Sequence, residues 1–224
     1  MAVLLTARNI TKEFGSVKAL SGINLDVNEG ELVCLRGRSG SGKTTLINIL
    51  GALDSPTEGI VTFGGEDITA YSQIKKDKLR RSEMAFVFQS VALIGSMTAL
   101  ENVELALRLA NVPAKNRSKR AKECLARVGL EKRMKHVPAE LSGGEQQRVA
   151  IARAICHEPK LIFADEPTAE LDTVTGLAVM KLFRDLVKDS EHKHTIIMTT
   201  HDEAMMESAN VTYTLEDGII INKE

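Results

Sequence analysis

Aromatic residues are scarce in this chain of 224 residues, which contains six Phe, two Tyr and no Trp. That scarcity argues against a protein that stacks successive nucleobases on an extended aromatic surface. No apolar run approaches the ~20 residues that a helix needs to cross a bilayer. Residues 1–8 lack the basic region and the long apolar region of a signal peptide. We therefore expect an intracellular protein without a membrane span.

Cysteines are also few, and the three present are far apart in the sequence without the spacing of metal ligands. We interpret them as small core residues of a protein in a reducing compartment. They are Cys34, Cys124 and Cys156.

Charge of either sign is not in excess, because the net charge is −1, and hydrophobic residues make up an ordinary 43%. We therefore expect no nucleic-acid partner. The charge is nonetheless unevenly distributed. Residues 1–90 have 11 basic and 10 acidic residues, residues 91–157 have 12 and 6, and residues 158–224 have 6 and 14. The three segments thus carry net charges of +1, +6 and −8.

Hydrophobic periodicity predicts an α/β protein. Strand–helix alternation after residue 160 is typical of a parallel sheet with helices on both faces. Helical periodicity covers residues 100–130, with a polar break at 112–118. We predict one domain over 1–224, in which a helical segment, 91–157, is inserted between 1–90 and 158–224. The predicted strands are 17–27, 31–35, 59–63, 161–164 and 195–199, and a helix is predicted at 175–186.

The segment 37–44 reads G-R-S-G-S-G-K-T and matches the phosphate-binding pattern G-x-x-x-x-G-K-[ST]. A β-type run precedes it, and Leu46, Ile49, Leu50 and Leu53 then recur on one helical face. Backbone N–H groups freed by the glycines, together with Lys43, suit a polyphosphate. The alternative is a Gly/Ser-rich turn with an exposed lysine. We prefer a nucleotide site comprising Gly37, Arg38, Ser39, Gly40, Ser41, Gly42, Lys43, Thr44 and Thr45.

Two carboxylates, Asp165 and Glu166, follow the apolar run 161–164. In open α/β sheets, ligands bind at the carboxyl ends of the strands, where these residues fall. A phosphate-loop enzyme needs one such aspartate for Mg²⁺, with the hydroxyl of Thr44 as a second ligand. Glu166 is then positioned to orient the attacking water. A solvated Asp-Glu pair at the start of a loop is the alternative.

A second candidate anion site begins at Ser142, in the stretch 141–148, which reads L-S-G-G-E-Q-Q-R. Ser142 followed by Glu145 is a capping-box pattern, so a helix is predicted to start here. Its N-terminal dipole favours an anion beside Gly143 and Gly144. A capped helix without a ligand is the alternative.

These three motifs together resemble the ATP-binding-cassette ATPases, the nucleotide-binding subunits of ABC transporters, over essentially the whole chain. The resemblance implies a P-loop NTPase core of RecA-like type with an N-terminal antiparallel β subdomain and an inserted α-helical subdomain. It identifies 141–148 as the signature motif and 169–172 as the D-loop. It implies four further site residues, each matching a family motif: Phe14 for adenine stacking, Gln89 for the Q-loop, Asp172 in the D-loop and His201 as the switch histidine.

The resemblance also implies a mechanism. Two subunits close head to tail around two ATP molecules, so that the P-loop of one meets the signature of the other. Glu166, His201 and Gln89 are the implied catalytic residues, and Thr44, Gln89 and Asp165 the implied Mg²⁺ ligands. The implied nucleotide contacts beyond the P-loop are Phe14, Ser142, Gly143, Gly144, Glu145 and Asp172.

A separate membrane permease is the implied partner, docking near Gln89 and the positively charged helical subdomain 91–157. The chain is then cytoplasmic, peripheral on the inner face of the membrane. Segments such as 100–103, L-E-N-V, and 164–168, A-D-E-P-T, resemble the macrolide-exporter and lipoprotein-release type, which includes antimicrobial-peptide transporters. Three residues depart from the expected motifs: Glu145 replaces the Gln of many ABC proteins, and Ala169-Glu170 replaces the Gly-Asn that is usual in this subfamily.

Other functions are compatible with parts of this pattern. A mechanotransmission ATPase, which drives an envelope enzyme or sensor without transport, has the same cassette. Cassette ATPases of translation or DNA repair usually have two cassettes or long coiled-coil insertions, and neither is present. P-loop kinases and switch GTPases need no signature helix. The basic stretch 115–122 is either a contact for lipid headgroups or RNA or, more simply, a solvated helix face.

Overall fold

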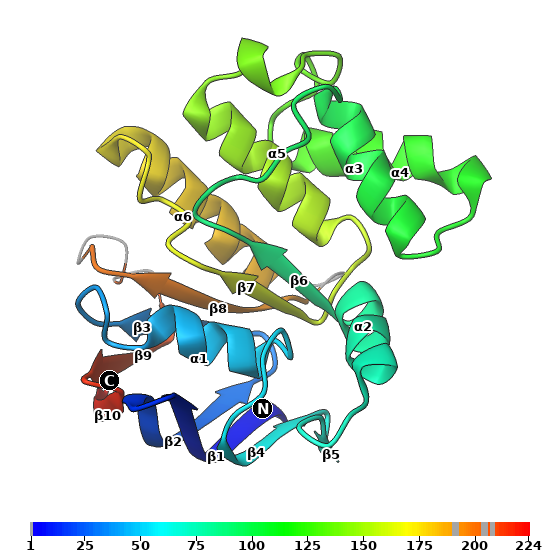
Figure 1. Cartoon of the computed structure of the whole chain (residues 1–224). Coiled ribbons are helices and arrows are strands. Elements are labelled where there is room, and N and C mark those ends of the chain that lie inside the picture. The colour runs from blue at the N-terminus through cyan, green and yellow to red at the C-terminus, as the bar shows by residue number, and fades with distance from the viewer. Residues whose placement is uncertain (1, 190–192, 203–205, 207–208) are drawn as a thin grey trace.

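The computed structural model describes residues 2–189, 193–202, 206 and 209–224. Figure 1 shows two sheets, with one helix between them and a group of helices over the far face of the larger sheet. The smaller sheet is antiparallel, with strand order β2-β1-β4-β5. Its strands are β1 (Val3–Phe14), β2 (Val17–Asn28), β4 (Glu58–Phe63) and β5 (Glu66–Asp67).

The larger sheet has six strands in the order β10-β9-β3-β8-β7-β6. All neighbouring pairs are parallel except β9 and β10 at one edge. The carboxyl ends of β3, β8, β7 and β6 therefore meet at the same edge of the sheet. The strands are β3 (Leu32–Arg36), β6 (Met84–Val87), β7 (Leu161–Ala164), β8 (Thr195–Thr200), β9 (Val211–Glu216) and β10 (Ile219–Lys223).

Apart from α2, which lies beside β6 at one edge, the α-helices divide between the two faces of the larger sheet (Figure 1). Helix α1 lies between the two sheets, and α3 to α6 cover the opposite face (Figure 1). A short 3₁₀ helix, Pro138–Glu140, precedes α5. The α-helices are α1 (Lys43–Leu50), α2 (Gln73–Ser82), α3 (Ala99–Leu109), α4 (Ala114–Arg127), α5 (Gly143–Ile155) and α6 (Thr173–Lys188).

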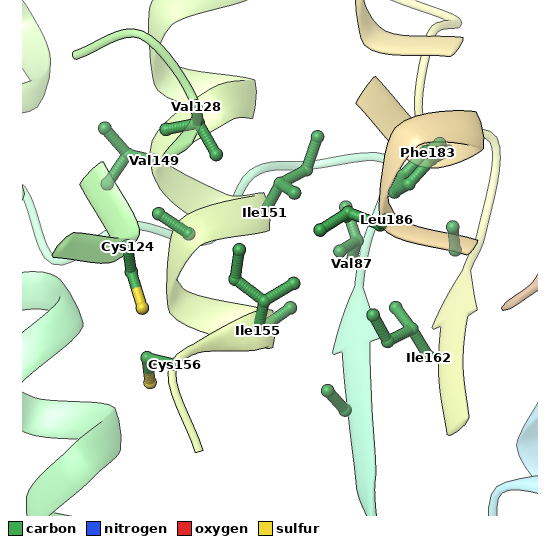
Figure 2. Packing of buried hydrophobic residues seen from close by; sticks show 14 of the residues in the cluster. Val87, Cys124, Val128, Val149, Ile151, Ile155, Cys156, Ile162, Phe183 and Leu186 are labelled. Carbon is green, nitrogen blue, oxygen red and sulfur yellow. The ribbon is translucent and has the colours of Figure 1, made fainter. Parts of the chain in front are cut away.

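Alternate residues of each central strand enter two different hydrophobic clusters. In β3, Cys34 faces the helical layer, whereas Val33 and Leu35 face α1 and the smaller sheet. Figure 2 shows the first cluster, where Ile151 and Ile155 of α5 lie beside Val87, Ile162 and Phe183. The central strands β3 and β7 are buried on both faces, which explains why they are continuous apolar runs in the sequence.

The predicted α/β fold, with an antiparallel N-terminal sheet and a helical layer, is confirmed. Three details of the sequence analysis were wrong. The polar break predicted at 112–118 is much shorter, because α4 already begins at Ala114 and its charged residues face solvent. Leu53 does not extend the apolar face of α1, which ends at Leu50, and its side chain is exposed. Helix α6 starts at Thr173, because the side chain of Asp172 caps it.

Candidate nucleotide site

The predicted phosphate loop connects β3 to α1 and closes around the ammonium of Lys43. Its Nζ donates hydrogen bonds to the carbonyl oxygens of Gly37, at 2.8 Å, and Arg38, at 3.0 Å. The Lys43 side chain is only 5% exposed. Gly42, the residue before α1, has a φ of 100°, and a Cβ there would lie 2.8 Å from the carbonyl oxygen of Ala19. The loop therefore holds one buried cation at the N-terminus of a helix, which is an anion site.

Asp165, directly after β7, joins the phosphate loop to the neighbouring strand β8. Its Oδ2 accepts a hydrogen bond of 2.9 Å from the hydroxyl of Thr44, at the start of α1. Its Oδ1 accepts one of 2.6 Å from the hydroxyl of Thr199. Hydroxyl and carboxylate oxygens are hard ligands that suit Mg²⁺, so this pair fits the predicted metal.

Within the described ranges, no group of three or more His, Cys, Asp or Glu side chains is arranged to hold a metal.

Glu166 lies between the ammonium of Lys43 and the imidazole of His201. Its Oε1 is 3.8 Å from Lys43 Nζ, and its Oε2 is 3.4 Å from His201 Nδ1. Its backbone has a φ of 44°, which is uncommon for a residue other than glycine, and its N–H donates to the Thr199 hydroxyl at 2.8 Å. The strained backbone turns the carboxylate toward the phosphate loop, where it can contact a bound anion or its attacking water.

Thr199 is the residue that the sequence analysis missed. Its buried hydroxyl bonds both Asp165 and the backbone of Glu166, so it fixes the two acidic residues together. The sequence offers only a weak signal for it, since Thr199 lies two residues before His201 but is one of three threonines in the same strand.

Phe14 and Gln89, the two single residues predicted at the edges of the site, are both exposed. Phe14 ends β1 at a hairpin whose next strand passes beside Gly42, and Lys12 Nζ lies 4.9 Å from the centre of its ring. Gln89 follows β6 by two residues. Because the N–H of Asp165 donates to the carbonyl oxygen of Val87 in that strand, Gln89 lies at the same edge of the sheet as Asp165.

The second predicted anion site is the start of α5. The hydroxyl of Ser142 accepts from Glu145 N at 3.3 Å, and Ser142 N donates to Glu145 Oε2 at 2.9 Å, so the capping box is confirmed. The backbone hydrogen bond from Ser142, and then those from its hydroxyl and from Arg133, lower the pKa of Glu145. Gly143 is exposed, which leaves the helix N-terminus accessible.

The N-termini of α5 and α6 lie side by side. A Cβ at Gly144 would overlap Thr175 Cγ2, so the two helices touch there. Asp172 caps α6 by accepting from Thr175 Oγ1 at 2.6 Å and from Thr175 N at 3.1 Å, and these hydrogen bonds lower its pKa. The predicted signature motif and the D-loop are therefore neighbours.

One chain brings the phosphate loop together with Asp165, Glu166 and His201, but not with the signature motif. Residues 142–145 line neither of the two cavities found beside the phosphate loop in the described part of the chain. The smaller cavity, of about 180 Å³, contains Lys43, Thr44 and Glu166. The larger, of about 530 Å³, extends from Arg38 and His201 to the turn between β9 and β10.

A separate groove of about 430 Å³ lies on another side of the molecule, between α2, β6, α3 and the end of α5. Its apolar lining includes Phe86, Phe88 and Leu105, and its charged lining comes from Arg80, Arg81 and Arg153. Because Phe88 in the groove is followed directly by Gln89, the groove is adjacent to the candidate nucleotide site.

Comparisons with known sequences agree with this geometry. The family model described as ABC transporter matches residues 20–169. An uncharacterized ABC transporter ATP-binding protein of Thermotoga maritima is 48% identical over 204 residues, which are 91% of this chain and 86% of the relative. The lipoprotein-releasing system ATP-binding protein LolD of Bacteroides fragilis is 42% identical, over 97% of this chain and 100% of LolD.

The macrolide export ATP-binding/permease protein MacB of Vibrio parahaemolyticus is 42% identical over 98% of this chain, which spans only 34% of MacB. Among solved structures, a dimeric post-hydrolysis state of the ATP-binding cassette MJ0796 with ADP and Pi has a TM-score of 0.89 and 40% identity. The match covers 99% of this chain and 98% of that one.

None of the helices in the described residues is long and apolar enough to span a bilayer. A P-loop with a buried lysine, an acidic strand end and a capped signature helix occur here in a fold shared with solved ABC cassettes. The chain belongs to the ABC transporter family, as an ABC-type ATPase that forms the ATP-binding cassette subunit of a transporter.

Proposed function

We propose that this chain binds Mg²⁺-ATP between two copies of itself and hydrolyses it to power a separate membrane permease. The observation that carries the proposal is the group formed by Lys43, Thr44, Asp165, Glu166 and His201 at one sheet edge. The similarity to LolD and MacB favours a permease of the macrolide, lipoprotein or antimicrobial-peptide type. The subunit is then cytoplasmic and peripheral to the inner face of the membrane.

The triphosphate binds the phosphate loop, residues 37–45, through its backbone N–H groups and Lys43. The exposed ring of Phe14 stacks on the adenine. Thr44, Asp165 and Gln89 hold the magnesium ion, directly or through water. When bound, the metal neutralises charge on the β- and γ-phosphate oxygens.

Glu166 orients the attacking water and accepts its proton, while His201 contacts the γ-phosphate. The two groups are 3.4 Å apart, so His201 also holds the carboxylate in place. Lys43 stabilises the charge that develops on the transferred phosphoryl group. Thr199 is a positioning residue, because it acts through the two acidic residues that it bonds.

The start of α5 completes the site from the second copy. Ser142, Gly143, Gly144 and Glu145 meet the γ-phosphate held by the partner, and Asp172 lies beside them. Dimeric cassettes among the solved relatives support this arrangement. Because the signature has its ligand only when a γ-phosphate is present, ATP closes the dimer and hydrolysis opens it.

The groove beside Gln89 receives a segment of the permease. Its apolar floor suits the apolar face of a short helix, and Gln89 is one residue from Phe88 in its wall. Opening of the ATP site can therefore be transmitted to the membrane partner through this groove. CbiO1 of Clostridium perfringens, a solved relative that is part of an ABC transporter complex, supports such an assembly.

The decisive experiment replaces Glu166 by Gln and measures ATP binding, dimerisation and hydrolysis separately. We expect normal ATP affinity, a stable ATP-bound dimer and turnover reduced by roughly 10²-fold or more. Near-normal turnover would refute the role of Glu166. Lys43→Ala is the matched control for binding, because it should lose ATP affinity itself, and an unchanged affinity would refute the phosphate cradle.

Copurification from membranes tests the remaining part of the proposal. A permease that copurifies with the wild type, and is lost when Phe88 in the groove is replaced by Asp, identifies the partner and the docking site together. Retention of the permease by that variant would place the docking surface elsewhere.

A further inference from the structure

Two exposed side chains of opposite charge lie in the nucleotide motifs without a charged partner among the described residues. Arg38 is in the phosphate loop and Glu170 is in the D-loop, and both are exposed. Among the residues that the structure describes, neither side chain forms a hydrogen bond or ion pair; only the backbone carbonyl of Arg38 accepts, from Lys43 and Ser41. Glu170 is also a departure from the Gly-Asn expected at this point of the D-loop.

Within one subunit these two charges belong to different parts of the candidate nucleotide site, Arg38 to the phosphate loop and Glu170 to the loop beside the signature motif. Arg38 lines the larger cavity together with His201. Glu170 lies two residues before Asp172, the cap of α6, whose first turn touches Gly144 of the signature. The D-loop also touches the signature directly, since a Cβ at Gly143 would be 3.8 Å from Leu171 Cδ2. Any movement of the signature motif relative to the phosphate loop therefore also moves Glu170 relative to Arg38.

We propose that Arg38 of one copy pairs with Glu170 of the second copy in the ATP-bound dimer. The inference rests on the proposed function, because it requires the phosphate loop of one copy to face the signature of the other. Twofold symmetry makes the contact reciprocal, so each dimer contains two such pairs. The guanidinium of Arg38 presents a planar fork that matches a carboxylate.

Electrostatics explains why Glu170 needs such a partner. Closing the dimer moves this carboxylate toward the seam that contains the triphosphates, where unpaired negative charge is unfavourable. A cation from the opposite phosphate loop removes that cost. Because the pair forms only across the seam, it also selects a second copy of this chain over a cassette with other residues at these two positions.

Groups on the same subunit compete for Arg38. Glu216 and Asp217, in the turn between β9 and β10, line the same cavity, as do Arg36 and His201. The structure shows no ion pair of Arg38 with Glu216 or Asp217 in the described residues. The experiment must nevertheless separate a pair within one subunit from a pair between two.

Charge reversal in the Glu166→Gln background makes that distinction. With ATP, the Arg38→Glu homodimer has two carboxylates facing each other at both seams, and the Glu170→Arg homodimer has two guanidinium groups. Each change replaces two attractive pairs by two repulsive ones. We expect dimerisation at least about tenfold weaker for each variant, by sedimentation or light scattering, with the difference reduced at high salt.

Mixing the two weakened variants is the sharp test. In a mixed dimer, the introduced glutamate faces the introduced arginine at one seam, and the native Arg38 faces the native Glu170 at the other. Both seams are then complementary, so dimerisation should return to within about threefold of the parent. A pair within one subunit does not predict this recovery. Glu131→Arg, an exposed change in the helical layer, and Glu216→Gln are the controls, and we expect neither to weaken the dimer.

The proposal is overturned if both single variants dimerise like the parent, or if the mixture stays as weak as its components. Because Arg38 belongs to the phosphate loop, the ATP affinity of each variant is measured first, and dimerisation is compared at ATP concentrations that saturate each variant. A parent that remains monomeric with ATP refutes the proposed function itself, whereas a dimeric parent with unaffected variants refutes only the pair.

Discussion

Replacing Thr199 by Val tests whether one buried hydroxyl organises the acidic edge of the site. Valine has nearly the same shape as threonine, so packing in the core is retained while the hydroxyl is lost. Asp165 then loses a 2.6 Å donor, and the N–H of Glu166 loses its acceptor at 2.8 Å. Nothing else in the change affects β8, in which Thr199 is fully buried.

The expected loss follows from those two contacts. A hydrogen bond to a charged carboxylate contributes about 1.5–3 kcal/mol, and an unsatisfied buried N–H costs about 1–3 kcal/mol. Asp165 and Glu166 are partly accessible, so water replaces some of each contact, and we take the lower values. Thr199→Val should therefore destabilise the protein by about 2–3 kcal/mol. For a chain of this size that lowers Tm by roughly 5–10 °C.

Catalysis should fall as well, because both acidic residues lose the contact that sets their orientation. We expect kcat to fall roughly 10- to 100-fold, with a smaller change in the KM for ATP, which depends on the phosphate loop. Urea denaturation and steady-state ATPase assays measure the two effects. Thr199→Ser is the matched control, since it keeps the hydroxyl, loses one methyl worth about 0.8 kcal/mol and should retain kcat. A Val variant within 0.5 kcal/mol of wild type and with normal kcat would refute the reasoning.

Three further predictions concern the helical layer and the buried thiols. Gly144→Val should separate α5 from Thr175 of α6 and lower the free energy of unfolding by about 1–3 kcal/mol, measured by chemical denaturation. The control Gly143→Ala, at an open position, should change it by less than about 1 kcal/mol. Equal effects of the two variants would contradict the packing. Because the folded pKa of Glu145 is lowered, its capping-box contribution is present above the usual value of 4.5 and is lost as the pH falls through the folded pKa. Stability of Glu145→Ala should therefore depend less on pH below 4.5 than that of wild type, and parallel curves would exclude this linkage. Burial raises the pKa of the three thiols, to about 12 for Cys34, about 11 for Cys124 and about 12 for Cys156. Thiol reagents at pH 8 should therefore label these cysteines only after unfolding. Rapid labelling of the native protein would contradict their burial.

Much of the core could be predicted because its strands are buried on both faces. The predicted bounds match β7 without error and β3 and β8 to within one residue; those of β4, a half-exposed strand of the smaller sheet, also agree to within one residue. The start of α5 was predictable from local chemistry, since the capping box of Ser142 and Glu145 needs no tertiary contact.

Other elements carry no comparable signal. Helix α2 buries only Lys76, whose Nζ donates to Ser55 Oγ at 2.7 Å, so its sequence has no apolar periodicity to detect. The strand β1 was missed because register shifts interrupt its alternation against β2. Thr199 was missed for a different reason, since its role depends on the pairing of β7 with β8, which no single segment of sequence specifies.

The division of the interior into two clusters by one sheet has a consequence for how such chains can diverge. Residues at odd and even positions of β3 pack in different clusters, Leu35 on the side of the smaller sheet and Cys34 on the side of the helical layer. The outer surface of α4 is mostly exposed, whereas Ala121 and Leu125 on its inner surface belong to the same buried cluster as residues of the strands that end at the candidate nucleotide site. Deleting the helical segment would leave one face of the central sheet bare. Substitutions on the outside of the helical layer are therefore expected to leave the fold intact, whereas loss of the layer is not.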